Sequence, residues 1–184
     1  MNGLASQEFD ALRQTIRSRG TARPIMFLVG LATWAATLLA ILLLLQNPIA
    51  SVVPLLVLLA TFETVRSLHL GVERIGRYVQ VFFEEGVGNQ APVAAPAWEH
   101  TAMIFGPGAP GAGVHPFFQP VFMLATLANL LAVLLPAPLL VEMATLLVPH
   151  VAFLVWIIHC NRKMRKQRAI ELARFRQIRS ALAQ

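Results

Sequence analysis

Four long apolar runs restrict the folds open to this chain more than any other feature of its sequence. A helix needs roughly 20 apolar residues to cross about 30 Å of hydrocarbon, and each run approaches or exceeds that length. Because a bilayer offers no water to backbone groups, each run is expected to be helical. The runs are Ile25–Leu45, Ile49–Leu70, Phe117–Leu135 and Leu139–Ile158.

The composition supports a membrane protein over a small soluble domain. Hydrophobic residues make up 57% of the chain and charged residues only 13%, against roughly 45–50% and 25% in soluble domains. The alternative is that the runs form two core hairpins of a soluble protein. That alternative is disfavoured, because the first two runs and the turn between them have no polar face to present to water.

The distribution of Lys and Arg predicts how the chain crosses the membrane. The short turns 46–48 and 136–138 contain no Lys or Arg, whereas basic residues precede the first span and follow the second and fourth spans. Basic residues are retained on the cytoplasmic side, so both termini and the central loop are expected to be cytoplasmic. We therefore predict an all-α, polytopic protein of the plasma (inner) membrane, with four transmembrane helices in two hairpins. The net charge of +6 is interpreted as this topology signal rather than as nucleic-acid binding.

Five segments follow from this topology. The second and fourth helices are expected to extend beyond the membrane into the cytoplasm, because no helix-breaking signal separates each apolar run from the charged residues after it. The segments are an N-terminal amphipathic segment (1–24), the first transmembrane hairpin (25–70), a cytoplasmic helix extension with a Gly- and Pro-rich loop (71–116), the second hairpin (117–158) and a basic C-terminal helix (159–184).

The extension of the second helix has an apolar stripe with spacings of three and four residues. This periodicity is typical of a helix that packs against a partner. The stripe, interpreted as an assembly surface, consists of Val65, Leu68, Val72, Ile75, Val79 and Phe82.

The opposite side of this extension is polar and is expected to be solvated. Glu73 and Arg77 are four residues apart in the order that favours an ion pair, and Gln80 and Glu84 have the same spacing, which predicts a hydrogen bond between them. A sharper interpretation applies where the helix leaves the membrane, because ionisable groups at that depth need partners or water. There, Glu63, Arg66 and His69 would line a cytoplasmic vestibule or bind a polar ligand.

A candidate polar pathway or ligand site combines that cluster with polar residues inside the apolar runs. Residues of this kind either carry a proton or polar solute, or serve as hydrogen-bonding contacts between helices. Both interpretations remain open at the level of sequence. The residues are Glu63, Arg66, His69, Asn129, Glu142 and His150.

The C-terminal tail is strongly basic, and its first part is expected to contact anionic lipid headgroups of the inner leaflet. The tail helix itself either lies on lipid or packs beside the extension of the second helix. Cys160 is the only cysteine, so it forms no internal disulfide, and it is either palmitoylated or a buried thiol. The headgroup contacts are expected at Arg162, Lys163, Arg165, Lys166 and Arg168.

No motif for phosphate binding, nucleophilic catalysis, zinc or haem occurs in the chain, so neither a cofactor nor enzymatic activity is expected. Five residues would be the donors of a metal site, but their spacing matches no known ligand pattern. They are Glu84, Glu85, Glu99, His100 and His115.

Three functional hypotheses follow. The first is a non-catalytic membrane subunit or scaffold that forms a homo-oligomer or joins a larger membrane complex. The second is an oligomeric channel or a transporter of protons or small solutes, lined by the polar pathway. The third is a membrane enzyme acting on lipid or quinone. The protruding helices, which need partners, favour the first.

Overall fold

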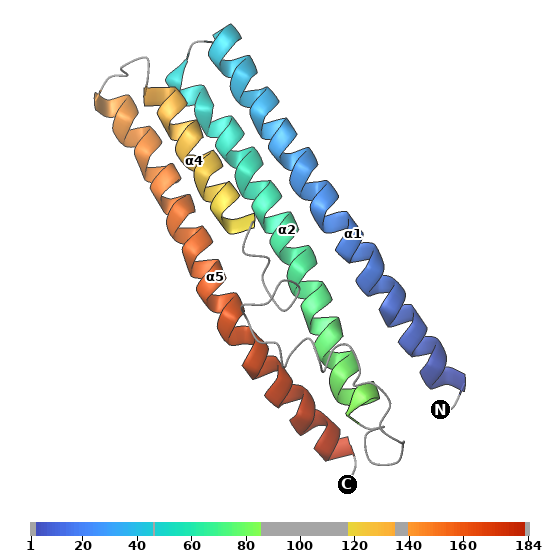
Figure 1. Cartoon of the computed structure of the whole chain (residues 1–184). Helices are drawn as coiled ribbons and strands as arrows, with labels where there is room; N and C mark the ends of the chain where they lie inside the picture. Colours follow the sequence, from blue (N-terminus) through green and yellow to red (C-terminus); the bar gives the residue numbers. More distant parts are fainter. Residues whose placement is uncertain (1–2, 46, 86–117, 135–139, 183–184) are drawn as a thin grey trace. The chain divides into compact units, whose positions relative to one another are not determined.

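The computed structural model describes residues 3–45, 47–85, 118–134 and 140–182 (Figure 1). Within these ranges every residue except Asn47 and Glu85 belongs to a helix, and no strand occurs. This confirms the all-α expectation for the described part of the chain.

Only residues 46 and 47 separate the first helical stretch from the second. Asn47 begins the second helical stretch, because its side chain accepts a hydrogen bond from the backbone N–H of Ile49 (3.0 Å) and Pro48 occupies the first helical position. The elements are α1 (Gly3–Ala40), the π-helix η1 (Ile41–Leu45), the 3₁₀-helix η2 (Pro48–Ser51), α2 (Val52–Val79), the π-helix η3 (Gln80–Glu84), α4 (Phe118–Leu134) and α5 (Leu140–Leu182).

Three helical stretches are long and apolar enough to cross a membrane: Gln7–Leu44, Pro48–Glu84 and Leu140–Ala181. Helix α4 is apolar but has only 17 residues, which corresponds to about 26 Å of helix. The end residues of its predicted run, Phe117 and Leu135, lie outside the described residues. By composition and length, this is therefore a helical membrane protein with at least three candidate spans.

The chain divides into two compact units. Unit 1 comprises Met1–Ala22, Leu68–His115 and Lys163–Gln184, and unit 2 comprises Arg23–Ser67 and Pro116–Arg162. Helices α1, α2 and α5 each contribute residues to both units, whereas α4 belongs to unit 2 alone (Figure 1).

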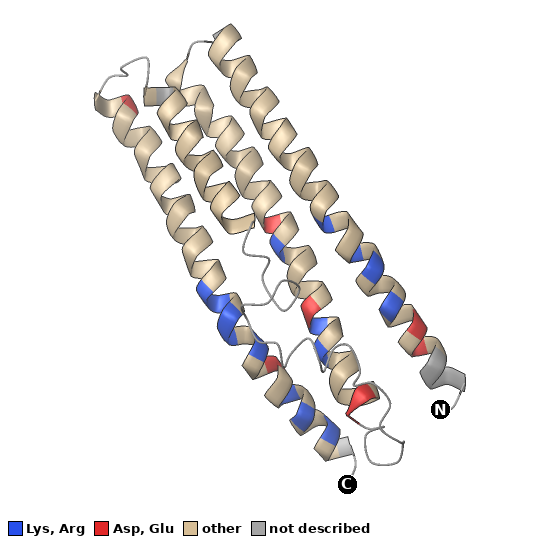
Figure 2. Ribbon diagram, viewed as in Figure 1, with Lys and Arg blue, Asp and Glu red and all other residues tan. Residues whose placement is uncertain are grey.

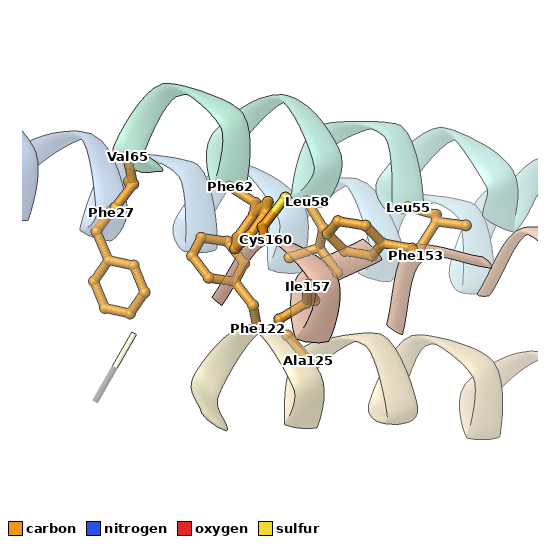
Figure 3. Close-up of a cluster of buried hydrophobic side chains, with 10 residues drawn as sticks. All are labelled: Phe27, Leu55, Leu58, Phe62, Val65, Phe122, Ala125, Phe153, Ile157 and Cys160. Atoms are coloured by element: carbon orange, nitrogen blue, oxygen red, sulfur yellow. The ribbon is translucent and has the colours of Figure 1, made fainter. Parts of the chain in front are cut away.

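Aromatic side chains organise the core of unit 2. Phe122 of α4 is fully buried, and its ring lies edge-on to Phe27 of α1 (5.6 Å between centroids) and to Phe62 of α2 (5.3 Å). Phe62 makes the same kind of contact with Phe153 of α5 (5.9 Å). Edge-to-face geometry is the arrangement that aromatic pairs prefer. The buried cluster (Figure 3) consists of Phe27, Leu55, Leu58, Phe62, Val65, Phe122, Ala125, Phe153, Ile157 and Cys160.

Gly30 lets α1 approach α2 closely within unit 2. A Cβ atom at Gly30 would lie 2.1 Å from the Cγ2 atom of Thr61 and 2.7 Å from its Cβ. The Thr61 side chain is short and β-branched, so it has little freedom to move aside. Close packing through small residues is a common way for helices to associate in lipid.

Unit 1 contains a second aromatic cluster. The ring of Tyr78 of α2 lies at a tilt of 32° to that of Phe82 of η3 (4.7 Å between centroids) and meets Phe175 of α5 edge-on (5.9 Å). Phe9 of α1 packs on Phe83 (5.5 Å). Of the two alternatives predicted for the tail helix, the structure therefore shows the one in which it packs beside the extension of α2.

Candidate functional site

Asn129 is the centre of a buried polar network in unit 2. Its Oδ1 atom accepts a hydrogen bond from the indole Nε1 of Trp34 (3.2 Å). Its Nδ2 group donates to the backbone carbonyl of Ser51 (3.2 Å) and to the Nε2 atom of His150 (2.8 Å). Asn129 therefore joins its own helix, α4, to α1, η2 and α5.

His150 is fully buried, and its contacts determine its tautomer. The carbonyl of Leu146 only accepts hydrogen bonds, so the Nδ1 atom of His150 (2.6 Å away) must carry the proton. The Nε2 atom then accepts the hydrogen bond from Asn129. The imidazole is accordingly a neutral connector between α4 and α5.

Every hydrogen-bonding atom at the centre of this network has a partner inside the chain. Both protons and the oxygen of the Asn129 amide are used, as are both ring nitrogens of His150. The hydroxyl of Ser51, which is also buried, donates to the carbonyl of Pro48 (2.7 Å). A satisfied buried network stabilises one arrangement of helices, because losing any member leaves an unpaired group.

Glu63 forms a second polar group in unit 2. Its carboxylate accepts hydrogen bonds from Arg66, one turn later on α2, and from the indole Nε1 of Trp156 on α5 (2.6 Å). Trp156 also stacks on His159 (5.8 Å, 18° between planes). Arg66 therefore balances the charge of Glu63, and Trp156 connects Glu63 to α5.

The six predicted pathway residues do not form one group. The structure joins Asn129 to His150 and Glu63 to Arg66. Glu142 lies in the first turn of α5, and His69 is buried in unit 1 rather than unit 2.

Three participants were not predicted as site residues. Trp34 and Trp156 are polar donors within apolar runs, and that was the available signal. Ser51 accepts through its backbone carbonyl, which its residue type does not signal. Their roles depend on which helices lie beside them, which no local pattern reveals.

Arg77 is the centre of an ion-pair network in unit 1. Its Nη2 group bonds the carboxylate of Glu73 on α2 (3.1 Å), and its Nη1 group bonds Glu171 on α5. Arg74 also donates to Glu171, from Nε (3.2 Å) and Nη2 (3.1 Å). The predicted pairing of Glu73 with Arg77 is confirmed.

The prediction that this polar side of α2 is solvated was wrong for Arg77 and Gln80, which are 3% and 2% exposed. Tertiary packing covers Arg77, because α5 supplies the carboxylate of Glu171 to the same side of α2 as Glu73. A buried guanidinium is tolerated when carboxylates pair with it in this way.

Glu171 is held in its charged form. Burial by itself would raise the pKa of its carboxyl. The hydrogen bond from Gln167 (2.7 Å), the charge of Arg77 and the hydrogen bonds from Arg74 and Arg77 together outweigh burial and lower that pKa below its usual value.

The predicted hydrogen bond between Gln80 and Glu84 was wrong. Gln80 instead donates from Nε2 to the Oε1 atom of Glu85 (3.3 Å). The cause is the π-helix η3, in which the backbone N–H of Glu85 bonds the carbonyl of Gln80 (2.9 Å). A π-turn places residue i+5 over residue i, so the spacing of four no longer applies.

The same π-turn places Glu85 against α5. Its carboxylate accepts from the Nη2 group of Arg176 (2.8 Å) and lies 3.8 Å from Arg179. The hydrogen bond and charge of Glu85 raise the pKa of the Arg176 guanidinium, which stays protonated. On the α1 side, Arg13 lies 3.7 Å from the carboxylate of Glu84. Charged pairs thus connect the three helical segments of unit 1.

The predicted assembly stripe is partly covered by the chain itself. Val65 lies in the core of unit 2 and is 4% exposed, and Val79 is fully buried in unit 1. Phe82 packs on Phe175, while Leu68, Val72 and Ile75 are half-buried.

The predicted headgroup-binding residues lie on α5, in the stretch of closely spaced basic residues in Figure 2. Arg162, Lys163, Arg165 and Lys166 are exposed, and Arg168 is half-buried. Cys160, just before them, is 2% exposed within the core of unit 2. The structure therefore favours the buried-thiol interpretation of this cysteine over palmitoylation.

Within the described residues, no group of three or more His, Cys, Asp or Glu side chains lies close enough together to hold a metal ion. Of the five residues considered as metal donors, Glu99, His100 and His115 lie outside the described residues.

Comparison of the chain with protein-family models, with curated proteins and with solved structures gave no match.

Proposed function

We propose that this chain is a non-catalytic integral subunit or scaffold of the plasma membrane, which assembles through its helices into a homo-oligomer or a larger complex. In this proposal α4 also crosses the membrane, so that α1, α2, α4 and α5 form two transmembrane hairpins, and both termini are cytoplasmic.

The observation that carries the proposal is the closed hydrogen-bond network around Asn129 and His150. Neither side chain has a hydrogen-bonding atom left for a substrate or a conducted proton. The network instead serves the contact between helices, as expected of a structural component. This also makes a pathway through a single chain the weaker alternative.

The distribution of charge supports the proposed topology. The Lys and Arg residues of unit 2 are Arg23, Arg66 and Arg162. Arg23 stands at the start of the α1 segment of that unit, whereas the other two stand at the ends of the α2 and α5 segments. In two hairpins these positions share one side of the membrane, which would be the cytoplasmic side.

Large apolar side chains exposed on α4 and α5 support insertion and assembly. Leu124 and Leu131 of α4 are 65% and 63% exposed, and Leu140 of α5 is 84% exposed. Exposed apolar surface of this kind is stable against lipid or against another subunit.

The decisive experiment is the mass of the particle purified in mild detergent from its native host, with its co-purifying proteins identified. The proposal predicts a protein mass well above the 20.2 kDa of one chain. A monomer without partners would contradict it.

The channel alternative needs a separate assay, which is proton or solute flux into liposomes containing the purified chain. The proposal predicts that flux stays at the level of empty liposomes. Flux that His150→Gln abolishes would instead establish the polar pathway, and would overturn the structural role given to the network.

A further inference from the structure

Two groups among the basic residues of unit 1 differ in their contacts. Arg74, Arg77, Arg176 and Arg179 form ion pairs with Glu73, Glu85 or Glu171. A second group, defined here as the collar, consists of Lys163, Arg165 and Lys166 of α5. These side chains are exposed, and they form no ion pair with any residue that the structure describes.

The collar follows directly after the apolar part of α5, which ends at Ile158. At 1.5 Å per residue, Lys163 and Lys166 lie about 8 and 12 Å beyond that residue along the helix. The headgroup layer on each side of a bilayer is about 5–8 Å thick, and Lys and Arg side chains are long enough to reach back toward it.

The three cations lie on one side of α5. A helix turns by about 100° per residue, so they lie within an arc of about 160°, and Lys163 is only about 60° from Lys166. All three side chains are exposed. Because this arc begins just beyond the apolar part of the helix, headgroups at the membrane surface would meet all three.

Three carboxylates of unit 1 are not available to the collar of a second copy of the chain. Glu73, Glu85 and Glu171 are already bonded to Arg side chains of their own chain.

We propose that the collar binds the phosphate headgroups of anionic lipids in the cytoplasmic leaflet. This inference rests on the proposed membrane topology. Each basic residue near an anionic surface contributes about fivefold in affinity, so the three together contribute on the order of 100-fold.

The test is native mass spectrometry of the full chain in mild detergent, titrated with phosphatidylglycerol and with phosphatidylcholine of the same acyl chains. The ratio of the two affinities measures selectivity for the anionic headgroup. The variant K163Q/R165Q/K166Q is expected to lower this ratio by up to about 100-fold. Its affinity for phosphatidylcholine should not change.

The control removes the same net charge farther along α5, at exposed positions: A173E/R174Q/Q177E. It is expected to keep the ratio within about threefold of wild type, because its sites lie beyond the headgroup layer. An equal loss in both variants would overturn the proposal, since net charge alone would then explain the selectivity. An unchanged ratio in the collar variant would also overturn it.

Two further measurements separate the possible causes of failure. If the collar variant does not fold, the single variants K166Q and R174Q replace it, with about a fivefold loss expected for the first only. Extraction of the wild-type chain from membranes by alkaline carbonate would contradict the membrane topology itself. Loss of an acidic co-purifying protein from the collar variant, with lipid selectivity unchanged, would assign the collar to a protein partner and overturn the lipid proposal.

Discussion

Units 1 and 2 share three helices but use different interactions to hold them together. In unit 2, edge-to-face Phe rings and the close approach at Gly30 surround a neutral network centred on Asn129. In unit 1, carboxylate–guanidinium pairs around Arg77 and Glu85 connect the helices, with Tyr78 in an aromatic cluster beside them.

The difference reflects what each environment permits. Neutral hydrogen-bonded pairs cost little free energy to bury where no water is available, whereas an unpaired charge there costs much more. Ion pairs cost less to form near water, where the charges remain partly hydrated. All but three of the basic residues and all but two of the acidic residues belong to unit 1. The change in chemistry along α1, α2 and α5 therefore agrees with the proposed exit of these helices from the bilayer.

The largest expected effect comes from breaking the ion-pair network of unit 1. Arg77→Leu leaves the carboxylates of Glu73 and Glu171 without their shared cation, and removing one partner of a buried pair typically costs about 3–5 kcal/mol. Hydrogen exchange measured by mass spectrometry should show faster exchange at 68–79 and 163–182, with 118–134 unchanged.

Arg174→Leu is the matched control, since Arg174 is exposed and its loss should change stability by less than about 0.5 kcal/mol. Faster exchange throughout unit 2 in the Arg77 variant would show that the two units are not separately stabilised.

A smaller effect is expected from filling the close approach in unit 2. Gly30→Ala places a methyl group against the Thr61 side chain, and overpacking of this kind costs about 1–3 kcal/mol. Thermal unfolding in detergent should show a lower midpoint.

Gly20→Ala in the same helix is the control, because a Cβ atom there meets nothing within 4 Å. It should leave the midpoint unchanged or raise it, since Ala favours a helix by up to about 1 kcal/mol over Gly. Equal responses at the two glycines would contradict the close packing of α1 on α2.

Breaking the polar network of unit 2 should lower the free energy of unfolding by less than Arg77→Leu or Gly30→Ala does. Asn129→Leu removes three hydrogen bonds between helices, and the expected cost is about 1–2 kcal/mol because such bonds are individually weak in a membrane environment. Thr126→Val, one turn earlier on α4, is the control, since its hydroxyl bonds only the carbonyl of Phe122 in the same helix (2.7 Å). If both substitutions have the same effect on the unfolding midpoint, the network does not hold the helices together.

The smallest effect concerns the protonation of Tyr78 in unit 1. Burial raises the pKa of its phenol above the usual value near 10. The hydrogen bond to Glu8 (3.0 Å) and the negative charge of Glu8 raise this pKa further. The neutral phenol therefore contributes stability below about pH 10, and this contribution is lost as pH rises through the raised pKa.

Tyr78 is the only tyrosine in the chain, so absorbance at alkaline pH reports on it alone. Glu8→Gln should lower the midpoint of this alkaline titration. Asp10→Asn, which removes an exposed charge two residues away from Glu8 in the sequence, should change the titration midpoint less. A wild-type midpoint at the usual value would contradict the packing of Tyr78 in unit 1.

Much of the secondary structure followed from local patterns. The extension of the second helix beyond its apolar run was predicted because its hydrophobic residues keep helical spacing without Pro to interrupt it. The pairing of Glu73 with Arg77 followed from the same spacing. It was not predictable that Gln80 bonds Glu85 rather than Glu84. Nothing in the local sequence distinguishes a π-turn from a regular helix end.

The candidate residues were recognised more readily than their contacts. Asn129 and His150 were conspicuous as polar groups in apolar runs, but their mutual hydrogen bond depends on how α4 packs on α5. Arg77 was assigned to a solvated face because its second carboxylate, Glu171, belongs to a helix distant in the sequence.

By itself, the sequence determined that the described residues are helical, and its four apolar runs predicted four membrane spans, of which the structure shows three as helices long and apolar enough to cross a membrane. Those properties depend on residue type and spacing within one segment. Only the tertiary structure decided which polar groups are buried, and which pairs neutralise or bond one another. The reason is that burial and pairing depend on neighbouring helices, and a side chain's own segment does not specify what packs against it.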